Sequence, residues 1–425
     1  MFNNRVIRNA SWIIGCRVAQ AVLAFFINLF TARYLGPSGY GLISYAASVV
    51  AFVVPIMNLG VNNILVNEFI KTPKREGEIL GTSIVMTLTT SVFCIIGIAT
   101  FVIISSPGEK DTLWVCVLYS LLLIFQSIEI VQYWFQAKFW SKYVSLCMLF
   151  SYLVVSAYKI FLLATNKSIF WFAISNAFDY CLIAFSLLII YKIKGGQRLQ
   201  FSFDVAKELF SQGKHYIIAG VMGVVLAQSD RVMLKTMLGN EEVGIYSAAY
   251  AIAGLTSFIF TAIVDSARPQ ILENKLNNGD VYEKSVSKLY GVVIYLAMAQ
   301  SLFISVFAPT IIDIMYGADY YHAIPVLYII VWYSTFSYIG GVRAVWVLAE
   351  KLQKYLWIVS LTGMILNIAL NFVFIPMLGA IGAAIATLIT QIFSNFIINY
   401  FVKKFKETNT LLIKGLNIFT LINKK

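Results

Sequence analysis

The chain has 425 residues, of which 60% are hydrophobic and only 12% are charged. Soluble domains carry about twice that share of charge, roughly 25%, so much of the apolar surface must face lipid. The net charge is +12, but the chain has no long soluble segment on which basic residues could cluster. This excludes a nucleic-acid-binding protein. Each membrane span needs about 20 apolar residues, so the chain has room for roughly twelve spans.

Apolar runs of spanning length predict twelve transmembrane helices, because irregular backbone cannot face hydrocarbon. A membrane β-barrel would instead show alternating segments of about ten residues, and the sequence has none. The first run is too long for a cleavable signal peptide and lacks a cleavage site, so we expect it to stay as an anchor. The predicted spans are residues 10–31, 41–58, 81–105, 113–136, 144–164, 169–191, 215–238, 244–264, 289–309, 322–349, 356–375 and 381–402.

The basic residues are distributed unevenly between the predicted loops. With the amino terminus in the cytoplasm, most of the 32 Lys and Arg residues fall on the inner side, and the outer loops contain only Arg33, Lys110 and Lys167. Because basic loops stay in the cytoplasm, this distribution predicts that both termini are cytoplasmic.

A short phrase occurs twice along the chain. Residues 35–46 and 238–249 both contain Leu-Gly, four residues, Gly, two residues, Ser, one residue and Ala. In each copy one predicted span ends at the Leu-Gly and another follows the second Gly. The phrase therefore predicts two lobes of six helices. Since six is even, both lobes start on the same side of the membrane, as a parallel repeat around a central cavity.

The predicted division of the chain follows from its longest inner connection, residues 192–214, which is basic. We expect this connection to link the two lobes. Beyond the last span the chain is again basic, and its weakly amphipathic residues 411–422 predict a helix at the membrane interface. The expected parts are an N-lobe at residues 1–200, a C-lobe at residues 201–402 and a cytoplasmic tail at residues 403–425.

Charged side chains within the predicted spans are the candidate functional residues, because a charge at the bilayer centre costs roughly 3 kcal/mol on insertion scales. Cations outnumber anions there, and an anionic substrate would balance the excess. We expect the cations to bind a negatively charged group such as a phosphate. The carboxylates would either couple transport to an ion or form structural salt bridges. The cations are Arg17, Lys159, Arg231, Lys235 and Arg343, and the carboxylates are Glu129, Asp179 and Asp230.

Arg231 and Lys235 are the strongest candidates among the cations. At positions i and i+4 they share one helix face, where like charges repel each other unless an anion lies between them. Arg343 is expected to line a cavity. The alternative is that a long cationic side chain extends along its span to the membrane interface, which stays open for Lys235, Arg17 and Lys159.

Motifs for other kinds of chemistry are absent from the sequence. There is no glycine-rich phosphate loop and no nucleophile elbow, so we expect neither a nucleotide-driven pump nor an enzyme. The five cysteines lie in predicted spans without a CxxC pair, and the two histidines stand alone. We therefore expect no cofactor and no metal site, although coupling to H⁺ or Na⁺ stays open.

Several segments, in the right order along nearly the whole chain, resemble the bacterial polysaccharide flippase family. Residues 31–41 are similar to its amino-terminal signature, and residues 59–61 follow where that family has Leu-Gly-Val. Residues 229–234 and 244–250 are similar to its central motif, which includes Asp230 and Arg231. Further similar segments are residues 268–270, 316–320 and 379–387.

The resemblance implies the fold of the multidrug/oligosaccharidyl-lipid/polysaccharide exporter superfamily, an all-α membrane protein with two six-helix bundles. It implies a transporter of the bacterial inner membrane that moves undecaprenyl-pyrophosphate-linked oligosaccharide between leaflets by alternating access. O-antigen translocases of lipopolysaccharide biosynthesis are the most similar, because lipid II flippases carry two further helices. The implied partners are the lipid-linked oligosaccharide, membrane lipids, a polysaccharide polymerase and a chain-length regulator.

Two other functions stay open at this point. A multidrug or cation antiporter of the same superfamily shares the architecture, but it would favour acidic cavity residues, whereas cations predominate here. A polysaccharide polymerase or another integral-membrane glycosyltransferase needs a large outer loop for catalysis. The longest outer loop, about residues 310–321, offers only Asp313 and Asp319.

Overall fold

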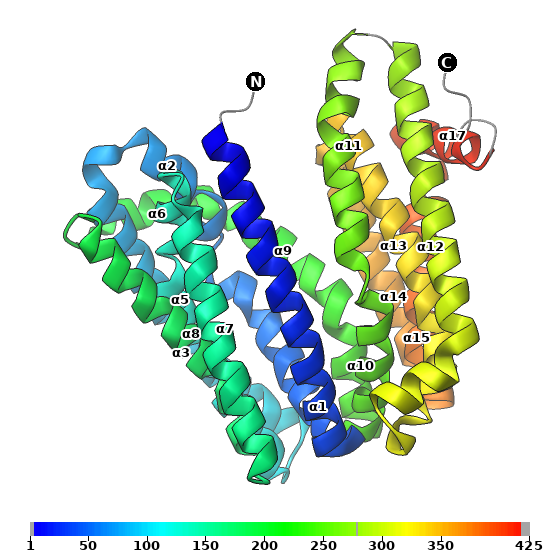
Figure 1. Cartoon of the computed structure of the whole chain (residues 1–425), viewed down its shortest axis with the longest axis horizontal. Coiled ribbons are helices and arrows are strands. Elements are labelled where there is room, and N and C mark those ends of the chain that lie inside the picture. Colours follow the sequence, from blue (N-terminus) through cyan, green and yellow to red (C-terminus); the bar gives the residue numbers. More distant parts are fainter. Residues whose placement is uncertain (1–3, 278, 418–425) are drawn as a thin grey trace. The chain divides into compact units, whose positions relative to one another are not determined.

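The computed structural model describes residues 4–277 and 279–417, with side chains from residue 15 onward except at residues 17, 18 and 277 (Figure 1). Within these ranges the chain forms helices and no strand. Eleven helical segments are long and apolar enough to cross a membrane. The all-α membrane fold predicted from the sequence is confirmed.

The chain divides into two compact units between Gln228 and Ser229. This division lies inside the long helix α9 (Phe203–Leu238), so α9 contributes its first part to one unit and its last part to the other. The lobe boundary expected between residues 200 and 201 stays a prediction.

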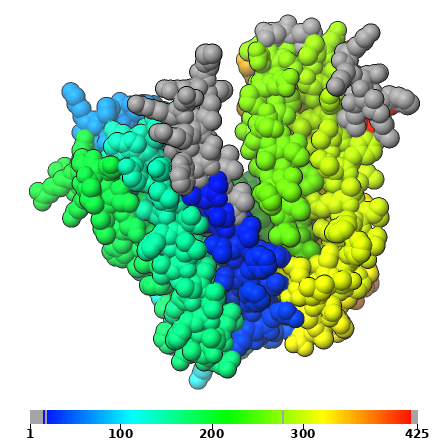
Figure 2. All heavy atoms as spheres, viewed as in Figure 1, coloured from blue at the N-terminus to red at the C-terminus, as the bar shows by residue number. Residues whose placement is uncertain are grey.

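The first unit is built mainly from α1, α3, α7 and α8, with α4, α5 and α6 following one another in a single span-length segment. Helices α1 and α7 pack side by side in Figure 1, and Figure 2 shows their side chains in contact. The helices are α1 (Asn4–Met57), α2 (Leu65–Lys71), α3 (Glu76–Ser105), α4 (Lys110–Ser120), α5 (Leu122–Glu129), α6 (Gln132–Ala137), α7 (Ser141–Ala164) and α8 (Ile169–Ile193).

Helix α1 consists of two helices that meet at Gly36, where φ is 65° and ψ is 176°. A straight helix of its 54 residues would extend about 80 Å, whereas the hydrocarbon core measures about 30 Å. The first two predicted spans are thus consecutive parts of α1. For this reason twelve predicted spans correspond to eleven candidate spans, the first of which is Ala19–Met57.

The second copy of the repeated phrase forms the same kind of corner. Gly239 has φ 106° and ψ −173°, and α10 (Asn240–Gly254) begins directly after it. Residues with a side chain rarely adopt a positive φ, whereas glycine does so at little cost. In both copies the Leu-Gly therefore marks the point where one membrane helix ends and the next begins.

The second unit contains the end of α9 and the helices that follow it. A π-helix, Phe393–Ile397, joins α15 to the short helix α16. Helix α12 packs along both α11 and α13. The helices are α10 (Asn240–Gly254), α11 (Ser257–Asn277), α12 (Gly279–Met315), α13 (Ala323–Ala349), α14 (Leu356–Leu378), α15 (Ala380–Ile392), α16 (Ile398–Phe401) and α17 (Lys406–Gly415).

Helices α11 and α12 continue well beyond the spans predicted for them, and Figure 2 shows them packed along each other. The 37 residues of α12 correspond to about 55 Å, more than the hydrocarbon thickness. Ion pairs support the polar extension: Arg268 pairs with Asp265 at 2.8 Å and Lys275 with Glu350 at 2.5 Å. Apolar runs do not predict this extension, because a helix in water needs no apolar run of spanning length.

The tail folds onto the second unit through α17, which packs against α12. The hydroxyl groups of Thr408 and Tyr290 lie 2.7 Å apart. At Gly415, a Cβ atom would lie 2.4 Å from the backbone oxygen of Ser287, so glycine allows the close approach of the two helices. The predicted interfacial helix, residues 411–422, lies only partly within the described residues, and its place in the membrane stays a prediction.

Candidate functional site

The predicted site residues lie in two groups, one within each compact unit. The side chain of Arg17 lies outside the described residues, so the structure gives it no place in either group. The first unit contains Glu129, Lys159 and Asp179, and the second contains Asp230, Arg231, Lys235 and Arg343.

Asp230 is the centre of a buried polar cluster in the second unit. Its side chain is 3% exposed and accepts three hydrogen bonds. Tyr246 and Thr387 donate to Oδ2, both at 2.7 Å, and Asn371 donates to Oδ1 at 2.6 Å. The donors come from α10, α15 and α14, so the Asp230 carboxylate joins four helices. Hydrogen-bond donors from three other helices thus converge on this one side chain.

The polar cluster continues along α14 through Asn367. The amide oxygen of Asn367 accepts hydrogen bonds from Asn371 at 3.1 Å and from the Ser229 hydroxyl at 2.8 Å. The amide oxygen of Asn371 is buried and has no hydrogen-bond partner among the described residues. We call Ser229, Asp230, Tyr246, Asn367, Asn371 and Thr387 the Asp230 cluster.

The Asp230 cluster offers oxygen atoms from one carboxylate, two amides and three hydroxyl groups. Oxygen ligands suit hard cations, whereas transition metals favour imidazole and thiolate ligands. The described part of the chain contains no group of three His, Cys, Asp or Glu that would hold a metal ion.

Arg231 follows Asp230 in sequence and shares one neighbour with it, because its guanidinium carbon lies 5.8 Å from the centre of the Tyr246 ring. Its Nε donates to the Ser247 hydroxyl at 3.1 Å, and its guanidinium carbon lies 4.6 Å from the centre of the Tyr250 ring. Tyr250 is itself held by Tyr333, with hydroxyl groups 2.9 Å apart. Stacking on an aromatic ring together with a hydrogen bond fixes the plane of the guanidinium.

Lys235 lies one helical turn after Arg231 on the same face of α9, as the i and i+4 spacing predicts. Its side chain is only 5% exposed, which is uncommon for lysine. Two cations thus lie along one side of α9, and one of them is oriented by aromatic rings.

Arg343 lies between α13 and the π-helix. Its side chain is 7% exposed. Its Nη1 donates to the backbone oxygen of Ser394 and lies 3.4 Å from the Oδ1 of Asn399. The wider turn of a π-helix disturbs the regular backbone hydrogen bonds, and the guanidinium meets one of its carbonyl groups. Both the expected place of Arg343 at a cavity and its contact with substrate stay predictions.

The carboxylates of the first unit lie on neighbouring helices. Glu129, on α5, is 6% exposed and accepts a hydrogen bond from the side chain of Gln132 at 3.2 Å. Asp179, on α8, accepts one from Ser151 at 2.6 Å. Asp179 interacts electrostatically with both Glu129 and Lys159. Among the described residues no ion pair within 4 Å joins Lys159 to Asp179, so the predicted salt bridge is at most a longer-range attraction.

Several partners of the candidate residues were not identified from the sequence. Tyr246 and Ser247, which contact Asp230 and Arg231, both lie in the second copy of the repeated phrase. From the sequence, that copy indicates a duplication and a similarity to the family's central motif, but not these contacts. Thr387 lies in the last of the segments that resemble the flippase family. Each signal was present, but no spacing rule connects residues on different helices.

Glu76 is a further buried carboxylate that the sequence did not single out. It lies at the start of α3, where Lys138 pairs with it at 2.5 Å and the Trp134 indole donates to it at 2.7 Å. Its depth does not mark it as a candidate, because it precedes the predicted span that begins at residue 81. Its partners indicate a structural contact between α3 and the end of α6.

Comparisons with known sequences agree with the resemblance. The pattern of the family described as "Polysaccharide biosynthesis protein" matches residues 6–275. The capsular polysaccharide biosynthesis protein CapF of Staphylococcus aureus is 20% identical over 408 residues, which cover 94% of this chain and 100% of CapF. The probable low-salt glycan biosynthesis flippase Agl15 of Haloferax volcanii is 23% identical over 187 residues, 44% of this chain and 40% of Agl15.

Solved structures show the same fold. A multidrug resistance MATE family transporter of the MOP superfamily, in an inward-facing conformation, matches with a TM-score of 0.69 and 12% identity, covering 92% of this chain and 96% of its own. The lipid II flippase MurJ, in an inward closed conformation, matches with a TM-score of 0.68 and 17% identity, covering 97% and 93%. The predicted exporter fold is confirmed.

Proposed function

Because the chain belongs to the polysaccharide biosynthesis protein family and has the exporter fold of the MOP superfamily, we propose that it is a flippase for a lipid-linked oligosaccharide. The proposed substrate is an oligosaccharide on undecaprenyl pyrophosphate, such as an O-antigen unit or a related surface polysaccharide unit. The proposed location is the bacterial inner membrane, with both termini in the cytoplasm. A polysaccharide polymerase and a chain-length regulator would act after it.

The pair of cations on α9 is the single observation that carries this proposal. A pyrophosphate bears several negative charges, and charge-assisted hydrogen bonds from arginine or lysine to phosphate are roughly twice as strong as neutral ones. Arg231 is held in one orientation by Ser247 and Tyr250, so little side-chain entropy is lost when it binds a phosphate. Lys235, a turn away, adds a second charge on the same face.

Alternating access provides the mechanism of movement. The polyprenyl chain stays in lipid throughout, because its transfer into water would be unfavourable. The pyrophosphate and the sugars, which hydrocarbon excludes, are carried past the α9 cations as the lobes open to one side of the membrane and then to the other. The protein therefore changes the leaflet of its substrate and breaks no bond in it.

The Asp230 cluster is the proposed coupling site. Its carboxylate is adjacent in sequence to Arg231 and joins α9 to α10, α14 and α15 through hydrogen bonds of 2.6 to 2.7 Å. A proton or Na⁺ at these oxygens would change the charge next to the substrate-binding helix and the packing of four helices at once. An ion gradient can drive transport through such a link.

The test is a flipping assay with the purified full chain in liposomes. The substrate is a fluorescent oligosaccharide on undecaprenyl pyrophosphate, and movement is measured by its accessibility to a membrane-impermeant glycosidase. We expect Arg231→Ala to lower the initial rate by about tenfold or more, because one charged hydrogen bond contributes about 1.5–3 kcal/mol. Arg268→Ala, which removes an exposed arginine paired with Asp265, should retain the rate.

Two results would contradict the proposal. One is an unchanged rate for Arg231→Ala at equal protein abundance in the liposomes. The other is efflux of a cationic drug, driven by an ion gradient, from liposomes in which the lipid-linked oligosaccharide does not move.

A further inference from the structure

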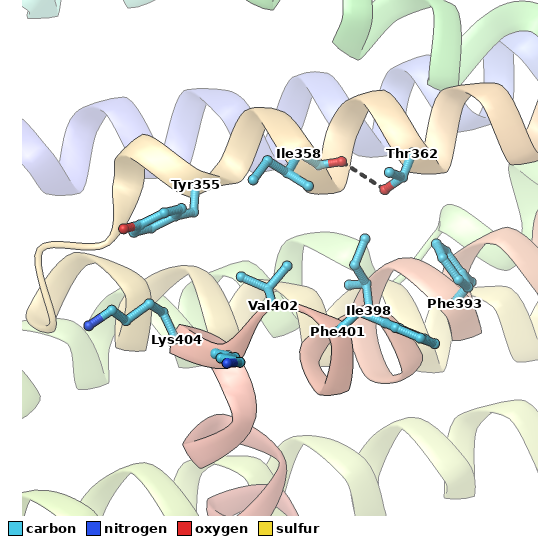
Figure 3. A pocket seen from close by; sticks show the side chains of 9 residues that line it. Tyr355, Ile358, Thr362, Phe393, Ile398, Phe401, Val402 and Lys404 are labelled. Carbon is cyan, nitrogen blue, oxygen red and sulfur yellow. Dashed lines mark hydrogen bonds between the residues drawn. The ribbon is translucent and has the colours of Figure 1, made fainter.

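A pocket of about 600 Å³ lies in the second unit, between α14 and the segment where α15 gives way to the π-helix and α16. Figure 3 shows that Tyr355 and Lys404 lie at one end of it and Thr362 and Phe393 at the other. None of the predicted site residues lines this pocket. Its lining residues are Tyr355, Ile358, Thr362, Phe393, Ile398, Phe401, Val402, Lys403 and Lys404.

The interior of the pocket is suited to hydrocarbon. Its walls are mainly aliphatic and aromatic, and the one hydroxyl in its depth, that of Thr362, already donates to the backbone oxygen of Ile358 at 2.7 Å (Figure 3). No polar group there requires a ligand with hydrogen bonds. Phe401 is 75% exposed, and Trp357 of the adjacent helix is also exposed, so this side of the unit presents apolar surface to lipid.

One end of the pocket is cationic. Lys403 and Lys404 line it, and Lys351 and Lys354 lie on the turn that leads into α14. Across the described residues none of these four lysines forms an ion pair within 4 Å. Glu350, next to Lys351, instead pairs with Lys275 at 2.5 Å and accepts a hydrogen bond from Tyr282 at 2.8 Å. Glu407 follows Lys404 by three residues, and the described residues show no ion pair within 4 Å between them.

This combination of an apolar pocket and a cationic end matches a lipid with a negatively charged headgroup. Basic pockets between membrane helices on the cytoplasmic side bind anionic headgroups, and each lysine near the surface adds about 1 kcal/mol. The proposed orientation places both the end of α16 and the turn before α14 on that side. A zwitterionic lipid would fill the apolar part equally well but would not balance the lysines.

We propose that this pocket binds one anionic phospholipid of the cytoplasmic leaflet, with an acyl chain between α14 and α16 and its phosphate at Lys403 and Lys404. The bound chain would replace missing protein contacts beside the π-helix and fasten α16 to α14. The site is separate from the α9 cations and does not depend on the nature of the transported substrate.

The experiment measures lipid binding to the full chain by native mass spectrometry from detergent, with phosphatidylglycerol and phosphatidylcholine of identical acyl chains. We expect the wild type to bind phosphatidylglycerol about tenfold more tightly than phosphatidylcholine, and Lys403→Gln with Lys404→Gln to remove that preference. The matched control is Lys284→Gln with Lys288→Gln, which removes the same charge from exposed positions on α12 and should keep the preference.

A second variant tests the apolar part without changing charge. Ile358→Trp fills the pocket and should lower phosphatidylglycerol binding about tenfold, while Trp357→Ile, on the neighbouring exposed position, should not. Equal loss in the Lys284 and Lys288 control, or equal binding of the two lipids by the wild type, would overturn the proposal.

Two further ligands separate a resident phospholipid from other phosphate sources. Inorganic pyrophosphate should not displace phosphatidylglycerol, because it has no chain for the pocket. If undecaprenyl pyrophosphate displaces phosphatidylglycerol and binds more tightly through Lys403 and Lys404, the pocket belongs to the transport route and the proposal of a resident phospholipid fails. A flippase proposal refuted by Arg231→Ala would leave these binding results unchanged.

Discussion

Arg343 shows how a buried cation in this fold is held through one of its nitrogens, while its Nε has no hydrogen-bond partner among the described residues. Its guanidinium meets the carbonyl of Ser394 and approaches Asn399. Asn399 in turn donates to the side chain of Asn409 at 2.8 Å, in the tail helix α17. Arg343 therefore links α13, the π-helix and the tail through a chain of polar contacts.

We expect Arg343→Met to destabilise the second unit. The substitution keeps much of the aliphatic volume but leaves the Ser394 carbonyl without its donor, which costs about 1–3 kcal/mol. Thermal unfolding of the purified chain in detergent measures the loss, and Arg343→Lys should recover part of it. A melting temperature unchanged by Arg343→Met would mean that the contact contributes no net stability.

Asp230 is expected to act through its charge rather than its size. Asp230→Asn keeps the shape of the side chain, which is 3% exposed. Its amide NH₂ group would face at least one of the three hydrogen-bond donors, and the cluster would lose its carboxylate acceptor. We expect flipping to fall about tenfold or more and its dependence on an H⁺ or Na⁺ gradient to disappear.

Thr387→Val is the matched control for Asp230, since it removes one donor and leaves the carboxylate charged. It should slow flipping less and keep the gradient dependence. The coupling role would be wrong if Asp230→Asn flipped substrate with the same response to the gradient as the wild type.

At the scale of elements, the corners of the repeated phrase depend on two glycines. A Cβ atom added at Gly36 or Gly239 would meet no atom of the surrounding described residues within 4 Å, and both glycines have positive φ. Alanine at either position would meet no steric barrier, so its cost is conformational, about 1–2 kcal/mol. The two corners should therefore respond to substitution in the same way.

This expectation has a control within α9. Gly223 is helical and equally unobstructed, so Gly223→Ala should stabilise the chain by about 0.5–1 kcal/mol, while Gly36→Ala and Gly239→Ala should lower the melting temperature. If all three substitutions shifted the melting temperature in the same direction, positive φ would not be the cause.

Element boundaries were predictable only where hydrophobicity determines them. The apolar runs predicted the membrane helices, and the Leu-Gly in each copy of the repeated phrase predicted where one span ends. The polar ends of α11 and α12 were missed because their helices are supported by ion pairs such as Lys275 with Glu350. The π-helix was not predicted, and its contact with Arg343 joins residues 51 positions apart, which no local sequence pattern connects. Likewise, Asp230 was found from its depth, but its partner Tyr246 on α10 was not.

At the scale of the whole molecule, the basic loops make a prediction about orientation. Lys167 follows α7 and Lys74 precedes α3, and both side chains are exposed. With both termini in the cytoplasm, a cysteine at position 167 faces outward and a cysteine at position 74 faces the cytoplasm. Lys167→Cys should react with a membrane-impermeant maleimide in intact cells, and Lys74→Cys only after the membrane is opened.

The native cysteines favour this measurement because they are not exposed. Four are buried and Cys181 is half-buried, so background labelling should be low and can be removed with Cys181→Ser. Labelling of position 74 but not of position 167 in intact cells would invert the proposed topology.

The π-helix at Phe393–Ile397 determines the direction, around the helix axis, in which the later side chains point. Successive residues of an α-helix are offset by about 100° around the axis, so one additional residue in a turn swings all later side chains through roughly that angle. Deletion of a single residue from this segment would restore regular α-helical geometry there. The side chains of Phe401 and the lysines after it would then point in a different direction around the helix axis. The composition of the membrane segment would hardly change.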